Sequence, residues 1–219
     1  MKRWITPLKH PAAIMRGQWS SQPVQVAYLQ RLAAMPNPIL VDVSKPPPGC
    51  LTAPTLGELR AFVEEVEAAA PCDVVFDIEN AGPQLICCGM LILRSTHLLD
   101  ISQDSLMRGV CFRVRRQGGG LWWAGIQHNE AMALMRRVLG NEKVRKVGHF
   151  IVQHDIPLLE DAGFPVRGPI LDTSVLLHAV HSEMRKGLQF AATLFCGAPR
   201  WKDIPDEKGD ADEPAGEEV

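Results

Sequence analysis

Two carboxylates stand two positions apart inside an apolar stretch of the chain, Val75-Phe76-Asp77-Ile78-Glu79. On a strand, side chains two positions apart point to the same face, about 7 Å apart. Like charges on an inner strand repel each other and are costly to desolvate, unless cations lie between them. Carboxylate oxygens suit Mg²⁺ or Mn²⁺, and paired ions hold the attacking and leaving oxygens of a phosphodiester. Asp77 and Glu79 therefore predict a two-metal centre. The alternative is a carboxylate pair that faces water on an edge strand.

The elements that must position this pair follow from hydrophobic spacing. Thr55 and Glu58 have the spacing of a capping box, and apolar residues at helical spacing follow them, so a helix is predicted to open the compact domain. β-branched and aromatic runs predict strands. These strands are expected at residues 73–79, 85–93, 110–114 and 121–124, the last two as a hairpin around Gly118-Gly119-Gly120.

The second half of the compact domain alternates between strand and helix patterns. A strand is expected at residues 146–149, and helices at 129–139, 155–162, 173–183 and 188–195. A helix, then antiparallel strands, then alternating strands and helices indicate an α/β fold, a mixed sheet with helices on both faces.

Composition separates the two ends from this domain. Residues 1–54 are a Pro-rich leader with one short helix predicted near 24–34, and residues 203–219 hold eight acidic residues against one Lys. The acidic segment has few apolar residues and no helical period, which is typical of disorder. We therefore predict a leader over 1–54, a domain over 55–202 and a tail over 203–219.

Charge and hydropathy exclude several classes of protein. The formal net charge is −2, yet the first 202 residues carry 22 basic against 17 acidic residues, which permits a polyanionic ligand without requiring one. No run approaches the roughly 18 apolar residues of a membrane helix, and the N-terminus lacks the apolar part of a signal peptide. None of the six Cys forms a C-x-x-C pair. A soluble, cytoplasmic protein with reduced thiols is expected, without a membrane partner.

Two further segments complete an ordered set of motifs. Lys146-Val147-Gly148-His149 leads through a short segment to Asp155-Ile156-Pro157-Leu158-Leu159, and Ile170-Leu171-Asp172-Thr173 precedes a Leu-rich region that ends at Trp201-Lys202. With Asp77-x-Glu79 in front, residues 55–202 resemble the DEDD-type (DnaQ-like) 3′-5′ exonuclease superfamily. The proofreading domains of family A (phage-type) DNA polymerases are the most similar members.

The resemblance implies a fold, a reaction and a site. The fold is ribonuclease H-like, and the reaction removes nucleotides from DNA 3′ ends in replication or repair. Asp77, Glu79 and Asp155 would be the catalytic residues and would hold two Mg²⁺ or Mn²⁺ ions, while His149 and Asn80 would contact the nucleic acid. The expected partners are a single-stranded DNA 3′ end and a DNA polymerase domain or subunit.

The sequence departs from the family pattern at two places. Phe150 or Ile151 stands near the position of the usual Asn in the second motif, and the last motif, which has a Tyr or His before an Asp, is not found. The fourth carboxylate is therefore unassigned. Its candidates are Asp206, Asp210 or Asp212 in the acidic segment, or Glu183 after His178. The alternative function is an impaired exonuclease-fold module that binds nucleic acid or docks to a polymerase.

Several other residues have a structural and a functional interpretation. His149 and His154 flank Asp155 and are either metal ligands or polar surface, and Asp172 is expected to cap the helix that starts at Thr173. Residues 5–16 resemble the His-Pro-containing end of uracil-DNA glycosylases, which suggests a remnant of a longer replication protein.

Basic and aromatic residues suggest a surface for nucleic acid or an ordinary solvated face. One ring of Trp122 and Trp123 should lie in the core, and the outer ring is available to stack on a base. The basic residues on either side contact phosphates or face solvent. They are Arg113, Arg115 and Arg116 before the tryptophans, and Arg136, Arg137, Lys143, Arg145 and Lys146 after them.

Overall fold

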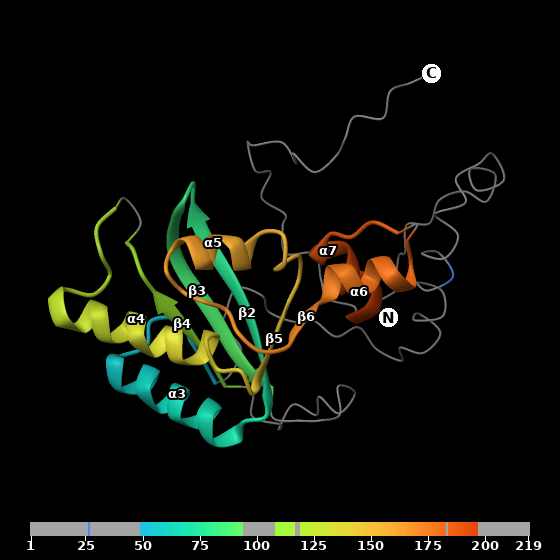
Figure 1. Cartoon of the computed structure of the whole chain (residues 1–219). Coiled ribbons are helices and arrows are strands. Elements are labelled where there is room, and N and C mark those ends of the chain that lie inside the picture. The colour runs from blue at the N-terminus through green and yellow to red at the C-terminus, as the bar shows by residue number, and fades with distance from the viewer. Residues whose placement is uncertain (1–25, 27–48, 94–107, 117–118, 183, 197–219) are drawn as a thin grey trace, which may run out of the picture. The chain divides into compact units, whose positions relative to one another are not determined.

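The computed structural model describes residue 26 and the ranges 49–93, 108–116, 119–182 and 184–196 (Figure 1). The chain divides into two units, Ser44–Val180 and the remainder, whose described part is mainly residues 181–196 without 183. Apart from residue 26, the predicted leader helix lies outside the described residues, as does the acidic segment. No helix in the described ranges is long and apolar enough to cross a membrane.

A six-stranded mixed sheet forms the centre of the first unit. Its strands lie in the order β1-β4-β3-β2-β5-β6. Strands β2, β3 and β4 are antiparallel neighbours, whereas β1 with β4, β2 with β5 and β5 with β6 are parallel pairs. The bounds are Cys50–Leu51 for β1, Cys72–Ala81 for β2, Gln84–Leu93 for β3, Arg108–Arg113 for β4, Val144–Gly148 for β5 and Ile170–Asp172 for β6.

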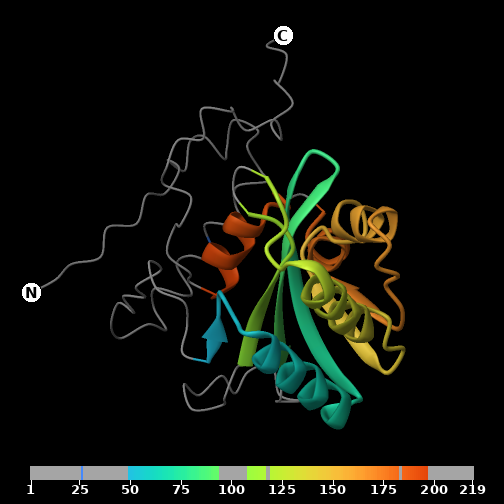
Figure 2. The same ribbon diagram turned by 90° about the vertical axis from the view of Figure 1, so that its left-hand side faces the viewer.

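Two helices cover one face of this sheet (Figures 1 and 2). Helix α3, Leu56–Ala69, begins at the capping box predicted from Thr55 and Glu58, and the backbone hydrogen bond from Thr55 lowers the pKa of Glu58. Helix α4, Gly125–Leu139, packs beside α3. The shared core contains every second residue of β2 and the apolar stripe of α3, namely Val74, Phe76, Ile78, Leu59, Phe62, Val63 and Val66. The opposite face of β2 is left for polar side chains.

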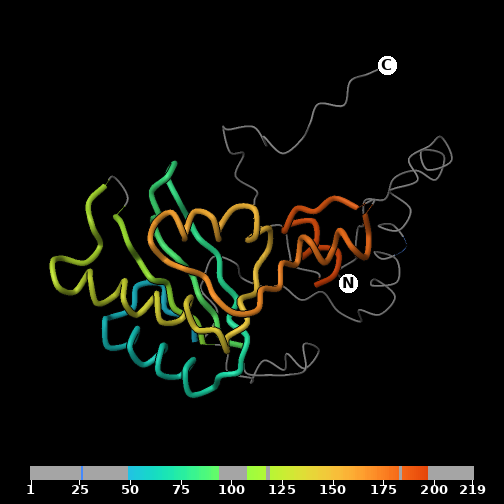
Figure 3. The backbone as a smooth tube through the Cα atoms, viewed as in Figure 1, coloured from blue at the N-terminus to red at the C-terminus, as the bar shows by residue number. Residues whose placement is uncertain are grey.

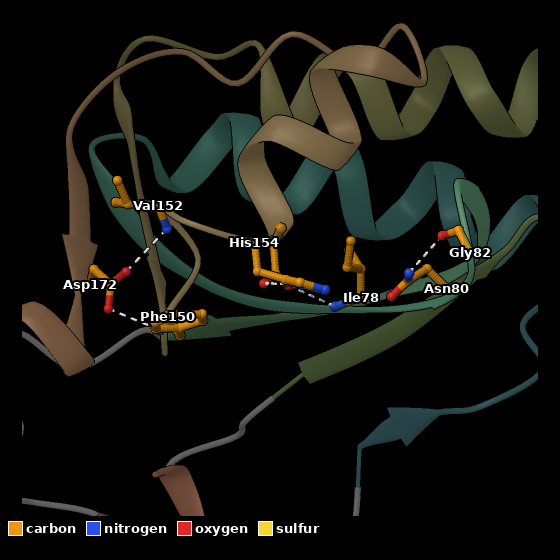
Figure 4. A network of polar contacts seen from close by, with 8 residues as sticks. Ile78, Asn80, Gly82, Phe150, Val152, His154 and Asp172 are labelled. Carbon is orange, nitrogen blue, oxygen red and sulfur yellow. Dashed lines mark hydrogen bonds and ion pairs between the residues drawn. The ribbon is translucent and has the colours of Figure 1, made fainter. Parts of the chain in front are cut away.

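The remaining helices of the first unit follow the parallel strands. The chain runs from β5 through a turn into α5, Asp155–Asp161, returns to β6 and continues into α6, Thr173–Val180 (Figure 3). Helix α5 contributes Leu159 to the core shared with α3 and α4, whereas α6 lies on the other side of the sheet (Figures 1 and 4). The predicted α/β fold, a mixed sheet with helices on both faces, is confirmed.

The described part of the second unit is a short helical segment. Helix α7, Leu188–Ala191, passes into a π-helix, Ala192–Cys196, where an α-helix had been predicted throughout. The ring of His181 stacks on that of Phe195 with centroids 6.1 Å apart. The ammonium of Lys186 donates to the carbonyl oxygens of His181 and Ser182 at 2.6 and 3.0 Å, which ties the segment before α7 together.

The predicted hairpin of residues 110–114 with 121–124 is reduced to an antiparallel bridge, because no strand forms at 121–124. Strand β4 pairs with β3 and β1. In the described residues, the backbone after β4 pairs with the later segment only through the Arg115–Leu121 bridge and the adjacent backbone hydrogen bonds, such as that from the Trp122 N–H to the Val114 carbonyl oxygen at 2.9 Å. The apolar residues of 121–124 have another use, because Trp123 packs against the core. Helix α4 starts at Gly125, four residues before the predicted start. Strands β1 and β6 are too short to show an alternating pattern.

Lys146 corrects the expectation of a basic surface after α4. Its side chain is fully buried, and its ammonium donates to the carbonyl oxygens of Asn141, Val144 and Arg167 at 2.5, 3.0 and 2.5 Å. Burial lowers its pKa to about 8. The three carbonyls replace water around the ammonium, so this lysine joins the loops at one end of β5 and contacts no solvent.

Candidate active site

The two carboxylates of the D-x-E pattern lie on the open face of β2. Asp77 and Glu79 are exposed, while the alternating residues Phe76 and Ile78 are buried in the core shared with α3 and α4. The strand pairing places Gly89 of β3 opposite Asp77. The prediction that both carboxylates share one face is confirmed. In the described residues β2 lies between β3 and β5, but its pairing with β5 ends at Val75, so the interpretation as a water-facing pair stays an alternative.

Asp155 joins these carboxylates from a distant part of the sequence. It is the first residue of α5 and only 4% exposed, and its Oδ1 accepts a 3.2 Å hydrogen bond from the backbone N–H of Ile78 (Figure 4). This N–H is available because the β2–β5 pairing ends at Val75 and Val147. A carboxylate from α5 thus lies against the β2 backbone between Asp77 and Glu79.

A tight turn before α5 brings Asp155 to this place. The turn starts at Gly148, where an added Cβ would lie 2.3 Å from a methyl group of Ile151 and 3.0 Å from the carbonyl oxygen of Phe76. Only glycine lets Ile151 enter the core so close to the end of β5. The next residue but one, Phe150, has φ of 65°, a left-handed conformation that is rare for a bulky side chain. The chain thereby reverses direction within a few residues.

Asp172 holds this turn closed. Its two carboxylate oxygens accept hydrogen bonds from the backbone N–H groups of Phe150 and Val152 at 2.9 and 3.0 Å (Figure 4). Oδ1 also accepts from the N–H groups of Ser174 and Val175, so the predicted capping of α6 is confirmed. Burial raises the pKa of Asp172, but the four backbone donors outweigh it and lower the pKa overall.

Two cysteines of β3 lie opposite the carboxylate segment of β2, Cys87 at Glu79 and Cys88 at Ile78, and Cys88 is part of the core. Burial raises the pKa of the Cys88 thiol, and the charges of Cys87, Asp155 and Asp77 raise it further. Cys87 lies opposite Glu79, and its hydrogen bond with Cys111, followed by burial, raises its pKa. Both Cys87 and Cys88 therefore remain neutral thiols at neutral pH.

The other predicted site residues have structural contacts. The Nδ1 of His149 lies 2.9 Å from Oγ1 of Thr173, and Asn80 donates to the carbonyl oxygen of Gly82 at 2.8 Å within the β2–β3 turn. His154 Nδ1 lies 3.3 Å from Asp155 Oδ2, with the ring half exposed. The structure thus brings His154 to the carboxylates, ties His149 to α6 and leaves the roles of His149 and Asn80 toward nucleic acid as predictions.

The residues present carry the ligand atoms that a divalent metal ion needs, but the described side chains alone do not form a complete metal-holding group. Asp77, Glu79 and Asp155 offer the hard oxygen ligands that Mg²⁺ and Mn²⁺ prefer. Within the described ranges, however, no group of three or more His, Cys, Asp or Glu side chains is arranged to hold a metal ion. Glu183 and the acidic residues 203–219 lie outside those ranges, whereas His178 is exposed on α6. The carboxylate cluster of Asp77, Glu79 and Asp155 is therefore not a preformed metal centre.

Sequence reasoning missed two contributors to this site. The role of Asp172 as a clamp on the turn before Asp155 was not predicted, although its capping role was. The left-handed residue Phe150 was also missed, because bulky residues rarely adopt this conformation and no sequence pattern marks it.

Known proteins resemble this chain only distantly. No protein-family description matches the chain, and no curated protein matches it. The catalytic core of RRP6 from Trypanosoma brucei is 18% identical with a TM-score of 0.48, and the match covers 78% of this chain and 40% of that one. The apo form of a nuclease is 15% identical, with a TM-score of 0.41 and coverage of 68% and 58%. The EXD2 exonuclease domain, soaked in Mn and GMP, is 19% identical, with a TM-score of 0.37 and coverage of 69% and 71%. The chain thus spans less than half of the RRP6 core.

Proposed function

We propose that this chain is a ribonuclease H-like domain of the DEDD exonuclease superfamily, which removes nucleotides from the 3′ end of a nucleic acid strand. The observation that carries this proposal is the hydrogen bond from the Ile78 N–H to Asp155. It holds the carboxylate of Asp155 at the β2 backbone between the residues Asp77 and Glu79, from a segment 77 residues away in the sequence. Asp155 is 4% exposed, and a buried carboxylate is costly unless hydrogen-bond donors or cations compensate its charge.

The proposed cofactor is Mg²⁺ or Mn²⁺, held by Asp77, Glu79 and Asp155. Divalent ions in such a position supply a nucleophilic water near neutral pH and neutralise charge on the phosphodiester. The chain's own part is to fix the carboxylates: β2 presents Asp77 and Glu79 on one face, and the turn held by Asp172 presents Asp155. We propose single-stranded DNA as the substrate and a DNA polymerase domain or subunit as a partner.

The experiment that tests the proposal is degradation of single-stranded oligonucleotides by the full chain. DNA and RNA strands of one sequence, labelled at either the 3′ or the 5′ end, are incubated with Mg²⁺, Mn²⁺ or a chelator. We expect early release of a 3′ label as a mononucleotide, only with metal. Asp77→Asn and Asp155→Asn should lower the rate on the order of 10²-fold or more.

Asp161→Asn is the matched control, because Asp161 ends α5 and is exposed. It should cleave like the original chain. Equal activity of the original chain and the Asp77→Asn variant would overturn the assignment of the reaction to this site.

The alternative function is a module that binds nucleic acid or docks to a polymerase with impaired chemistry. The observation that favours it is that the described side chains do not form a metal-holding group. Binding of the labelled strands without any metal-dependent cleavage would support this alternative over the exonuclease.

A further inference from the structure

Two arginines and a tryptophan stack together at the end of β4. The guanidinium carbon of Arg113 lies 4.3 Å from the centroid of the Trp122 ring, and that of Arg116 lies 5.6 Å from it. Both distances are within the range of cation–π attraction. We call these three residues the Arg–Trp–Arg stack.

The strand register places this stack on the carboxylate face of the sheet. Glu79 of β2 pairs with Cys87 of β3, and Cys87 pairs with Arg113 of β4, so the three form one row across the sheet. Two strand spacings separate Glu79 from Arg113, which is about 10 Å. Because Trp123 packs against the core on the other face, Trp122 lies on the side of Arg113.

The guanidinium groups of the stack have carbonyl and ring partners, an arrangement that Arg136 shares through Gly163 and Phe164. Arg113 donates from Nε to the carbonyl oxygen of Thr52 at 2.6 Å, and Arg116 reaches the carbonyl oxygen of Trp122 at 3.5 Å. In the described part of the chain neither has a carboxylate within ion-pair distance. Ion pairs within the described ranges include those of Arg60, Arg108, Arg137, Arg145 and Arg167.

This arrangement fixes the orientation of the two guanidinium groups and leaves their positive charge available to a ligand. A carboxylate partner would neutralise each guanidinium, whereas a tryptophan face and a carbonyl oxygen orient it and leave its charge. Oriented guanidinium groups bind phosphate oxygens in a fork geometry, and aromatic rings and guanidinium planes stack on bases. The alternative is that the stack only holds the end of β4 to the segment after β1, through Arg113 and Thr52.

We propose that the Arg–Trp–Arg stack binds the phosphates and a base of a single-stranded nucleic acid whose 3′ end lies at the carboxylate cluster. The location of the 3′ end rests on the proposed function. The stack supplies the attraction for a polyanion that Asp77 and Glu79 would otherwise repel. It lies one strand beyond Cys87, within reach of the nucleotides next to the terminal one.

Binding is tested without divalent metal, so that the result does not depend on catalysis. Fluorescence anisotropy measures the Kd of the full chain for a labelled oligothymidylate and an oligouridylate of equal length, over a range of salt concentrations. We expect Arg113→Gln with Arg116→Gln to weaken binding about tenfold. The slope of log K against log salt should fall by about 1.4, since each phosphate contact to a single strand contributes about 0.7.

The tryptophan and the controls separate binding from a structural role. Trp122→Ala should weaken binding about fivefold or more, and Trp122→Phe should restore most of it because the ring face remains. Arg137→Gln with Arg167→Gln removes the same charge from exposed ion pairs and should leave the Kd and the slope unchanged. If the variant that includes Arg113→Gln does not fold, Arg116→Gln alone tests the binding role of the stack, because Arg116 is exposed.

The outcomes distinguish this inference from the proposed function. An unchanged Kd and salt slope in the folded Arg113 and Arg116 variants would overturn the binding role of the stack, even if the chain cleaves oligonucleotides. A loss of binding in these variants, in a chain that cleaves nothing with metal, would support the stack and contradict the exonuclease.

Discussion

Asp172 accepts a 2.9 Å hydrogen bond from the backbone N–H of Phe150, the residue whose φ of 65° reverses the chain before α5. The same carboxylate caps α6 through Ser174 and Val175. One buried side chain therefore fixes both the start of α6 and the turn that delivers Asp155 to β2. The site depends on a residue that belongs to neither β2 nor α5.

Replacing Asp172 should destabilise the chain strongly. Asp172→Ala leaves four backbone N–H groups without their acceptor, and we expect a loss of about 3 kcal/mol in the free energy of unfolding. Asp172→Asn keeps one acceptor oxygen and should lose less. Urea unfolding followed by circular dichroism measures both. Equal stability of the alanine variant and the original chain would contradict the role of this carboxylate.

Acid should weaken the fold through the same residue. The folded-state pKa of Asp172 lies below its ordinary value, so its stabilising contribution is complete above about pH 4 and is lost as the pH falls through the folded-state pKa. Urea midpoints measured between neutral pH and about pH 2 should fall less in Asp172→Asn than in the original chain. Parallel curves for the two proteins would show that other carboxyls control acid unfolding.

The chain should be more stable with glycine than with alanine at position 150. Both variants remove a side chain that is 47% exposed, but only glycine adopts a positive φ without a steric penalty. We expect Phe150→Gly to exceed Phe150→Ala by about 1 kcal/mol in the free energy of unfolding. Thermal and urea unfolding of the pair provide the comparison. A more stable alanine variant would contradict the left-handed backbone at this position.

Because of Lys146, the free energy of unfolding of the chain should rise as the solution becomes alkaline. Its pKa is about 8 in the folded chain, below the ordinary value near 10.5, so the unfolded chain binds more protons between these two values. The free energy of unfolding should therefore increase from about pH 8 to 10.5, by up to about 3 kcal/mol. Lys146→Met lacks this group and isolates its share of the pH dependence. A rise of the same size in Lys146→Met would assign the effect to other groups.

Strong local patterns made much of the fold predictable. The capping box of Thr55 and Glu58 marks the start of α3, and the alternation around Asp77 and Glu79 gives both the strand and the shared face of the carboxylates. The position of Asp155 at the start of a helix also follows from the sequence. Its contact with Ile78 does not, because that contact requires β5 to end before β2, which is a property of the assembled sheet.

Residues whose environment is set by distant segments were not predictable. Lys146 looks like part of a basic surface, yet its three carbonyl partners come from segments that meet only in the folded chain. Trp122 and Trp123 are adjacent, and adjacent side chains in an extended segment point to opposite faces, so the sequence predicts one ring in the core. It does not predict the arginines that stack on the other ring. Long-range contacts decide such positions more strongly than local propensity does.

The hydrogen bond between Ile78 and Asp155 also occupies a backbone donor on a strand edge that would otherwise be open. Beyond Val75, β2 has no strand beside it on the β5 side in the described part of the chain, and an unpaired strand edge is a template for pairing with another molecule. Asp155 accepts the hydrogen bond of the Ile78 N–H in this stretch, and its carboxyl group lies where the backbone of another strand would have to bind. The carboxylate that serves the proposed chemistry thus also closes a strand edge of the kind that other chains can pair with.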